Sequence, residues 1–331
     1  MPPARDGRSK SAPQLAAVLY DAKRTDTHVA LEDVAIERLK AQQLLWMDVA
    51  ADDFETVAST LDLAAETVKA IASSPTEPML FVHDRYVHVV VIAPRTETAL
   101  HIPRPLHCLV GANWVLTVHR DPIEFLGAFD QRIRGDSELG KLDAYGFLAA
   151  ILHELVASYL AELRPIEADL DRIDLRSMTG RMDEEALLRE LVGIRLRLAK
   201  LRRMLEPHRE LFALLTRSEF TVLSGSQAAA DFDSLTDLLE RALQSMEATR
   251  EMITGSFEIY TTWTAHGTNR VIKRLTVVSV ALLPPTLLAG VMGMNSLPRA
   301  LVSGTAFVLS ILAIAALPVT VLVVARLRRL I

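Results

Sequence analysis

The chain has 331 residues, of which half are hydrophobic and 23% charged, with 36 basic against 41 acidic side chains. Residues 271–331 hold no Asp or Glu and six of the basic residues, which leaves 30 basic against 41 acidic residues in the first 270. This division excludes a uniformly soluble enzyme and a nucleic-acid binder, and a single cysteine, Cys108, excludes a disulfide framework.

The N-terminal part is predicted to consist of a short disordered segment followed by an α/β domain. Residues 1–14 lack the apolar run of a signal peptide and are expected to be disordered. Residues 15–143 mix helical spacing at 52–63 and 65–73 with β-type runs at 29–35, 44–49, 80–93 and 108–118. They therefore predict a cytoplasmic α/β domain. His101 and His107 flank two prolines and are expected in a loop, and Cys108 is expected in the core.

Long helices are predicted to follow. Residues 144–230 are rich in Leu, Ala, Glu and Arg, and their spacing indicates helices over 144–176 and 182–217 with a loop over 218–230. A heptad seam then begins near Asp231, whose side chain can cap a helix. Its members are Leu235, Leu239, Ala242, Met246, Thr249, Ile253, Ser256, Tyr260, Trp263 and Gly267. The seam predicts a stalk helix over 231–274 that packs against other helices, most simply those of identical copies.

Two uncharged runs end the chain. Residues 275–294 and 301–325 are each long enough to cross a bilayer of about 30 Å, and they predict two transmembrane helices; the competing reading is a pair of buried core helices. An outer loop, 295–300, separates them, and residues 326–331 form a basic tail. Arg270, Lys273 and Arg274 flank one open end of this hairpin. By the positive-inside rule both termini are cytoplasmic in a cell inner membrane.

The first span carries a stripe of small and weakly polar residues. At steps of three and four it contains Asn269, Ile272, Thr276, Ser279, Leu283, Thr286, Gly290 and Gly293. Such a stripe mediates close helix packing or lines a water-filled pore, and a symmetric stalk would supply the axis that a pore needs. No residue of the stripe is charged, whereas stripping Mg²⁺ of its water requires a cage of oxygen ligands. A pore of this kind would conduct ions with much of their hydration shell intact.

The tripeptide Gly293-Met294-Asn295 lies at the outer end of the first span, after Lys273-Arg274-Leu275-Thr276 and Pro284-Pro285-Thr286. In this position it resembles the CorA family of divalent-cation transporters, with the CorA and ZntB branches both open. Fainter similarity covers residues 45–49, 113–118 and 187–215. The resemblance implies a funnel-shaped homopentamer with an α/β cytoplasmic domain, a long all-α stalk and two C-terminal transmembrane helices.

The resemblance also implies roles for single residues. Gly293, Met294 and Asn295 would form the selectivity filter, with a ring of Asn295 side chains holding a hydrated ion. The pore below would be lined by Thr286, Leu283, Gly290, Ser279, Thr276, Ile272 and Asn269. Because family members bind regulatory metal at cytoplasmic carboxylates, Asp231, Asp233, Asp237 and Glu258 are candidate ligands.

The expected function is a Mg²⁺ channel that can also accept Co²⁺ or Ni²⁺, with no cofactor and no enzymatic motif in the sequence. Its expected partners are the bilayer, identical copies and divalent ions. The outer loop departs from the family pattern because it carries Arg299 and no acid, and Ser296-Leu297-Pro298 matches neither branch. Two alternatives therefore stand: a Zn²⁺ transporter of the same fold, which could be proton-coupled, and a membrane-anchored scaffold or sensor without transport.

Overall fold

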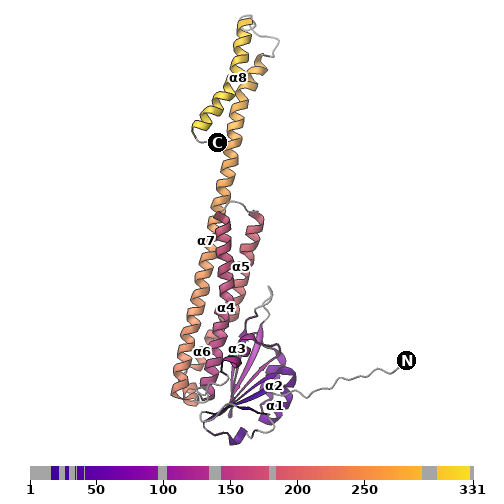
Figure 1. The fold of residues 1–331 in the computed structure, drawn as a ribbon, viewed down its shortest axis with the longest axis vertical. Helices are drawn as coiled ribbons and strands as arrows, with labels where there is room; N and C mark the ends of the chain where they lie inside the picture. The colour runs from indigo at the N-terminus through magenta and orange to yellow at the C-terminus, as the bar shows by residue number, and fades with distance from the viewer. Residues whose placement is uncertain are drawn as a thin grey trace, which may run out of the picture. The chain divides into compact units, whose positions relative to one another are not determined.

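The computed structural model describes residues 16–21, 27–29, 34, 36–40, 42–95, 103–133, 143–178, 184–292 and 304–328 (Figure 1). It divides into two compact units, Met1–Ile253 and Thr254–Ile331. The helix α7 (Ser218–Met292) contributes residues to both units.

A seven-stranded sheet organises the first unit. Its strand order is β2-β1-β3-β7-β6-β5-β4, and all neighbours are antiparallel except the parallel pair β3 and β7. The strands are β1 (Ala16–Asp21), β2 (Thr27–Val29), β3 (Gln43–Ala50), β4 (Met79–Val82), β5 (Val87–Ala93), β6 (Arg104–Val110) and β7 (Trp114–His119). The mixture of strands and helices expected for this part of the chain is therefore present.

Several boundaries differ from the prediction. The run 80–93 is a hairpin of β4 and β5, and 108–118 is divided between β6 and β7. The second division falls at Gly111, where an added Cβ would lie 2.1 Å from the Trp114 ring. The strand β1 was not predicted, and of the described residues in the run 29–35 only Val29 lies in a strand, β2. His107 was expected in a loop, but it is a buried residue of β6 that hydrogen-bonds His88 at 3.0 Å.

Helices cover both faces of the sheet. On one face α1 (Phe54–Leu61) and α2 (Ala65–Ser73) pack with Leu45, Met47 and Leu116 in one hydrophobic cluster. On the other face α3 (Glu124–Ile133) and α4 (Ala144–Met178) place Phe129 and Phe147 against Trp46, with ring centroids 5.9 and 5.5 Å away. Successive side chains of a strand lie on opposite faces of the sheet, so the same strands contribute residues to a hydrophobic core on each face.

The long helices follow the predicted pattern with two corrections. The expected helix over 182–217 is broken into α5 (Glu184–Leu205) and α6 (His208–Leu215) beside Pro207, since proline cannot donate a helical hydrogen bond. The expected loop over 218–230 is wrong, because α7 already begins at Ser218.

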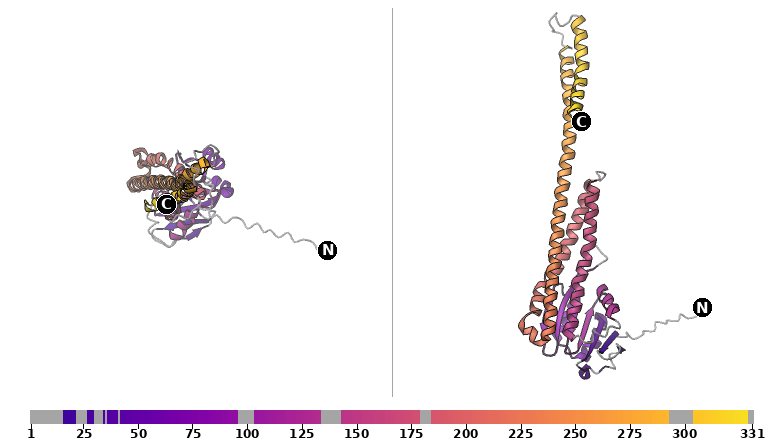
Figure 2. Two further views of the ribbon diagram at one scale, coloured as in Figure 1. Left: turned by 90° about the horizontal axis from the view of Figure 1, so that it is seen from above. Right: turned by 60° about the vertical axis from the view of Figure 1, so that its left-hand side comes forward.

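The residues of the heptad seam pack against other helices of the same chain. Its members Leu235, Leu239, Ala242, Met246, Thr249 and Ile253 are all buried. The Thr249 hydroxyl donates to the Glu167 carboxylate of α4 at 3.1 Å, and α4, α5 and α7 run side by side in both views (Figures 1 and 2). The inference that this part of the seam needs identical copies is therefore wrong.

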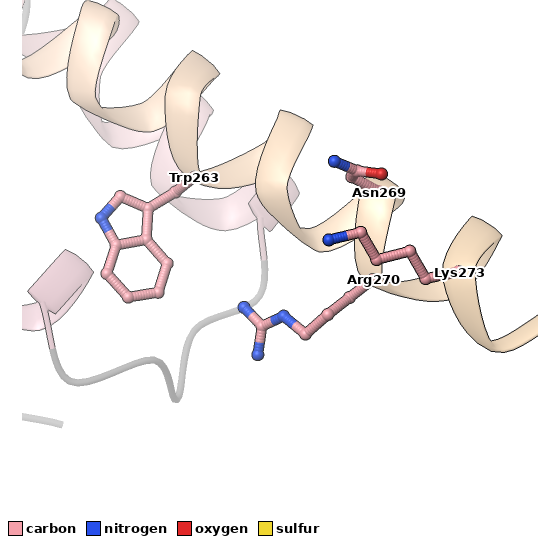
Figure 3. A pocket seen from close by; sticks show the side chains of 4 residues that line it. All are labelled: Trp263, Asn269, Arg270 and Lys273. Carbon is pink, nitrogen blue, oxygen red and sulfur yellow. The ribbon is translucent and has the colours of Figure 1, made fainter. Parts of the chain in front are cut away.

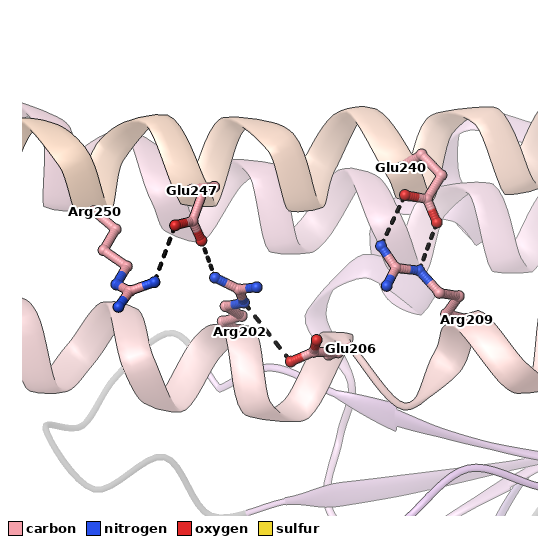
Figure 4. A network of polar contacts seen from close by, with 6 residues as sticks. All are labelled: Arg202, Glu206, Arg209, Glu240, Glu247 and Arg250. Carbon is pink, nitrogen blue, oxygen red and sulfur yellow. Dashed lines mark hydrogen bonds and ion pairs between the residues drawn. The ribbon is translucent and has the colours of Figure 1, made fainter.

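Ion pairs join α7 to α5 and α6 on the outside of this packing (Figure 4). Arg209 donates two hydrogen bonds to Glu240, at 2.6 and 2.8 Å, and Glu247 pairs with both Arg202 and Arg250. Such bidentate, networked pairs fix the register of neighbouring helices.

The second unit contains the C-terminal part of α7 and α8 (Gly304–Leu327), which lie side by side (Figures 1 and 2). Among the described residues, two segments are long and apolar enough to span a membrane, Ala144–Arg176 and Ala228–Met292, and Ile311–Leu327 is a shorter apolar stretch. The most apolar window of the first segment is 56% buried, which is typical of a core helix, whereas that of the second is 11% buried. The second segment therefore presents its apolar surface outward, as does α8, where Leu309, Leu312 and Val319 are exposed.

A buried histidine makes the first unit sensitive to acid. His208 accepts a hydrogen bond from the Ile92 amide at 3.1 Å and donates one to the Leu205 carbonyl, so its ring is neutral. Burial lowers the pKa of His208 from 6.5 to about 4. Between these two pH values the unfolded chain binds a proton that the folded chain does not. The contribution of neutral His208 to the free energy of unfolding is therefore fully present above pH 6.5 and is lost as the pH falls towards 4.

We expect His208 alone to reduce the free energy of unfolding by about 2 kcal/mol between pH 7 and pH 5. Thermal unfolding of the purified protein at both pH values measures this loss. The matched variant His208→Gln should be less stable at pH 7 but should lose correspondingly less on acidification. An equal loss in both proteins would contradict the assignment.

Candidate functional site

The stripe predicted on the first span occupies an uncovered face of α7. Its described members, Asn269, Ile272, Thr276, Ser279, Leu283, Thr286 and Gly290, are all exposed. The buried residues of the same segment, Val277, Ala281 and Pro285, recur every four positions on another face. A single chain therefore leaves the small and weakly polar residues of α7 without a packing partner.

The two threonine hydroxyl groups of the stripe donate hydrogen bonds within the helix. Thr276 donates to the Ile272 carbonyl at 2.8 Å, and Thr286 donates to the Leu282 carbonyl. Each hydroxyl oxygen keeps acceptor lone pairs that a water molecule can use. Pro284 and Pro285 have no N–H, so two carbonyls one turn earlier lose their helical donors. The stripe thus offers oxygen acceptors and no charge.

The predicted filter residues Gly293, Met294 and Asn295 lie outside the described residues, as do Arg299 and the rest of the outer loop. The described part of α7 ends one residue before the tripeptide, at Met292. The filter assignment therefore stays a prediction.

The four candidate carboxylates of the stalk are separated in one chain. Asp233 and Asp237 lie one turn apart on an exposed face of α7, Asp231 is half-buried, and Glu258 follows far along the same helix. Among the described residues no three His, Cys, Asp or Glu side chains are grouped to hold a metal. A regulatory ion at these positions would need ligands from more than one part of the assembly.

A shallow pocket lies at the inner end of the stripe (Figure 3). It has a volume of about 290 Å³ and is lined by Trp263, Asn269, Arg270 and Lys273. Asn269 was expected in the pore lining and Trp263 in the heptad seam, but the sequence did not predict that the four residues form one pocket. The spacing of seven between Trp263 and Arg270, which places both on one helix face, was the available signal.

Two similar proteins match different shares of the chain. YfjQ of Bacillus subtilis is 24% identical over 276 residues, which cover 82% of this chain and 85% of YfjQ. The cobalt/magnesium transport protein CorA of Methanocaldococcus jannaschii is 28% identical over 188 residues, or 55% of this chain and 57% of that protein.

Solved structures share the fold. The complete structure of the CorA magnesium transporter from M. jannaschii matches with a TM-score of 0.76 at 18% identity, covering 94% of this chain and 98% of that one. The full-length CmaX protein matches with a TM-score of 0.70 at 21% identity, covering 96% and 97%. At these identities the likeness concerns the fold alone.

The family profile decides the classification. The profile described as CorA-like Mg²⁺ transporter protein matches residues 41–329, which include the strands β3 to β7, the long helices and both C-terminal apolar segments. The chain belongs to the CorA-like family of divalent metal cation transporters, which are ion transporters and not enzymes.

Proposed function

We propose that the chain assembles as a homopentamer in the cell inner membrane and conducts hydrated divalent cations, with Mg²⁺ as its main substrate and Co²⁺ and Ni²⁺ as further substrates. The single observation that carries this proposal is the uncovered, uncharged face of α7, from Asn269 to Gly290. Five copies of this face around one axis would form a pore lined by hydroxyls, an amide and small residues.

The chemistry of this lining favours a hydrated ion. Mg²⁺ gives up its water reluctantly, and the described stripe holds no carboxylate that could replace that water. Hydroxyl and carbonyl oxygens can instead accept hydrogen bonds from the ion's own water molecules. In this proposal Gly293, Met294 and Asn295 form the selectivity filter at the outer end, and the Asn295 side chains hold the hydrated ion.

Both termini lie in the cytoplasm in this proposal, because Lys273 and Arg274 flank one span and Arg326 and Arg328 the other. Transport then runs inward, down the membrane potential. A potential of 100 mV supplies about 4.6 kcal/mol per divalent ion, at about 2.3 kcal/mol per elementary charge.

The stalk carboxylates are proposed as the regulatory site. Asp233, Asp237 and Glu258 are exposed, and the first 270 residues carry 41 acidic against 30 basic side chains. Apposed copies would repel one another unless divalent ions lie between them. Loss of Mg²⁺ would then loosen the assembly and open the pore.

We therefore expect removal of Mg²⁺ to raise hydrogen exchange in α7. The effect should be largest over residues 257–270, because residues 235–253 keep their seam packed within the chain. Exchange with millimolar Mg²⁺ and with chelator, followed by mass spectrometry of the peptides, makes the comparison. Equal protection in the two conditions would contradict regulation by bound metal.

The outer loop favours a second candidate function. Arg299 and the absence of acids from residues 295–300 remove the negative charge that would concentrate cations at the mouth. A scaffold without transport would tolerate this loop. A Zn²⁺ transporter of the same fold, which could be proton-coupled, is the other alternative, because Ser296-Leu297-Pro298 matches neither branch of the family.

Ion flux separates the three possibilities. Liposomes containing the purified protein, with an imposed inside-negative potential, should take up Mg²⁺ faster than Zn²⁺, as followed by ion-sensitive dyes. Zn²⁺ uptake that depends on a pH gradient would favour the carrier. No uptake of Mg²⁺, Co²⁺ or Zn²⁺ would favour the scaffold.

Arg299→Glu should raise Mg²⁺ uptake several-fold at low external Mg²⁺ and change it little at saturation. The reason is that charge at the mouth alters the local cation concentration, not the filter. Raising the salt concentration should shrink the difference, because ions screen exposed charge. A gain that persisted at saturating Mg²⁺ would contradict this explanation.

A further inference from the structure

Two adjacent prolines interrupt the backbone hydrogen bonding of α7 within the first span. Pro284 and Pro285 have no N–H, so the carbonyls of Val280 and Ala281, four residues earlier, lose the donor that an α-helix supplies. In hydrocarbon such an acceptor is strongly unfavourable, and membrane proteins tolerate it where it meets water or a polar group of a neighbouring element. The surroundings of the two carbonyls therefore decide what each can bind.

The two carbonyls belong to different faces of the helix. Residues three and four apart are neighbours on a helix surface, and the neighbours of Val280 at these spacings include Thr276 and Leu283 of the stripe. Val280 is 51% exposed, whereas Ala281 is 5% exposed and belongs to the buried face. Of this pair, the Val280 carbonyl is thus the one beside the stripe.

The helix itself offers this carbonyl little. The Thr276 hydroxyl donates to the Ile272 carbonyl at 2.8 Å, and no other side chain of the described residues donates to Val280. The Leu283 N–H, three residues on, serves the Ser279 carbonyl in a regular helix. A full hydrogen bond to the Val280 carbonyl therefore requires a donor from outside the helix, and water in the proposed pore is such a donor. Water bound to a cation is more acidic than bulk water, which makes it a stronger hydrogen-bond donor.

We infer that the Val280 carbonyls form a second ring of acceptors for a hydrated cation, deeper in the pore than the proposed Asn295 filter. Val280 lies twelve residues, or about 18 Å of helix, before Met292, where α7 ends. Five carbonyls, one from each copy, would accept hydrogen bonds from the water of the ion without removing it. An ion that leaves the filter would find a second weak site, as conduction through several sites requires. The inference rests on the proposed pore, to which it adds a main-chain site.

A cysteine in place of Val280 tests whether this level of α7 meets water. The chain has one cysteine, Cys108, which is fully buried, and burial raises the pKa of its thiol, so an introduced cysteine is the reactive one. Val278→Cys is the matched control. Val278 is 49% exposed, close to the value for Val280, but two residues place it about 200° away around the helix.

The full-length variants are placed in lipid vesicles and treated with a charged methanethiosulfonate reagent, and mass spectrometry follows the modification. Val280→Cys should react at least about tenfold faster than Val278→Cys, because a thiol surrounded by lipid forms its thiolate less readily. Millimolar Mg²⁺ should slow the reaction of Val280→Cys several-fold, since the bound ion and its water occupy the same level of the pore.

The prolines test the carbonyl itself. Pro284→Ala returns an N–H to the Val280 carbonyl and should lower Mg²⁺ uptake about five- to tenfold, as expected when about one hydrogen bond to the ion's water is lost. Pro285→Ala is the matched control, because it removes a neighbouring proline but supplies its N–H to the buried Ala281 carbonyl. It should change uptake less than about twofold. Pro284→Gly supplies the same N–H while the helix stays easy to bend, so it should be as slow as Pro284→Ala.

Several results would overturn the second ring while leaving the proposed transport function standing. These are parental Mg²⁺ uptake by Pro284→Ala, parental uptake by Pro284→Gly, which would make bending of the helix the cause, and an equal loss in Pro285→Ala. Equal modification of Val280→Cys and Val278→Cys would overturn the placement of Val280 beside water. Absence of ion flux in the unmodified protein would refute transport instead, and protection of Val280→Cys by Mg²⁺ would then still support a site for the hydrated ion.

Discussion

Asn295→Ala is expected to lower Mg²⁺ uptake at least about a hundredfold while the protein still folds and assembles. In the proposed ring, five amide carbonyls accept hydrogen bonds from the water of the ion, and a methyl group offers no acceptor. Each lost hydrogen bond is worth about 1 kcal/mol, and about 1.4 kcal/mol changes an equilibrium tenfold. Dye-reported uptake into liposomes measures the rate, and native mass measurement the assembly.

Two comparisons make the Asn295 result interpretable. The sequence contains three asparagines, and Asn113 lies in the exposed turn between β6 and β7, so Asn113→Ala is the matched control and should transport normally. Thr286→Val should lower the rate only a few-fold, because its hydroxyl is one of several weak contacts along the stripe. If Asn295→Ala took up Mg²⁺ at the parental rate, the assignment of Asn295 to the selectivity filter would be wrong, and the result would favour a scaffold without transport.

Phe147→Ala is expected to reduce the free energy of unfolding of the first unit by about 3 to 5 kcal/mol. Phe147 is fully buried at the start of α4, with its ring 5.8 Å from Tyr20, 5.5 Å from Trp46 and 5.5 Å from Phe129. Truncation leaves a cavity between the sheet and two helices. Chemical denaturation of the purified protein, followed by tryptophan fluorescence, measures the loss.

Phe147→Leu keeps most of the volume and should lose less than about 1.5 kcal/mol. Phe81→Ala is the surface-side control, because Phe81 is only partly buried on the edge strand β4, where it stacks on His88. A loss at Phe81 equal to that at Phe147 would show that the aromatic cluster has no special part in joining α4 to the sheet.

Periodicity located most elements because it records which side of an element is buried. It predicted α1, α2, α4 and β-structure over 80–93 and 108–118, and it placed the stripe of α7 on a face that the structure leaves exposed. It did not predict where α7 begins. The segment 218–230 contains serine, glycine and threonine, whose low helix propensity indicated a loop. A helix that is nucleated elsewhere extends through such residues at small cost.

Periodicity shows that one face of a helix is buried, but it does not show which element packs against that face. The seam of α7 was correctly identified as a packing surface, but its partner through Ile253 is the chain's own helical bundle, as the bond from Thr249 to Glu167 shows. The same limit applies to the pocket at Arg270 and Lys273, which requires side-chain positions as well as spacing. The charge asymmetry of the chain, by contrast, can be read directly from the sequence.

The order of elements along the chain has a consequence for biosynthesis. All strands of the sheet lie before residue 120, including the parallel pair in which Leu45 meets Trp114, whereas the C-terminal unit begins at Thr254. At about 5 to 20 residues per second, a ribosome needs roughly 7 to 27 s to pass from His119 to Thr254. Small domains fold within that time. The strands have thus had time to pair before the apolar end of α7 is translated, so the machinery that inserts this end works on a nascent chain whose sheet has already formed.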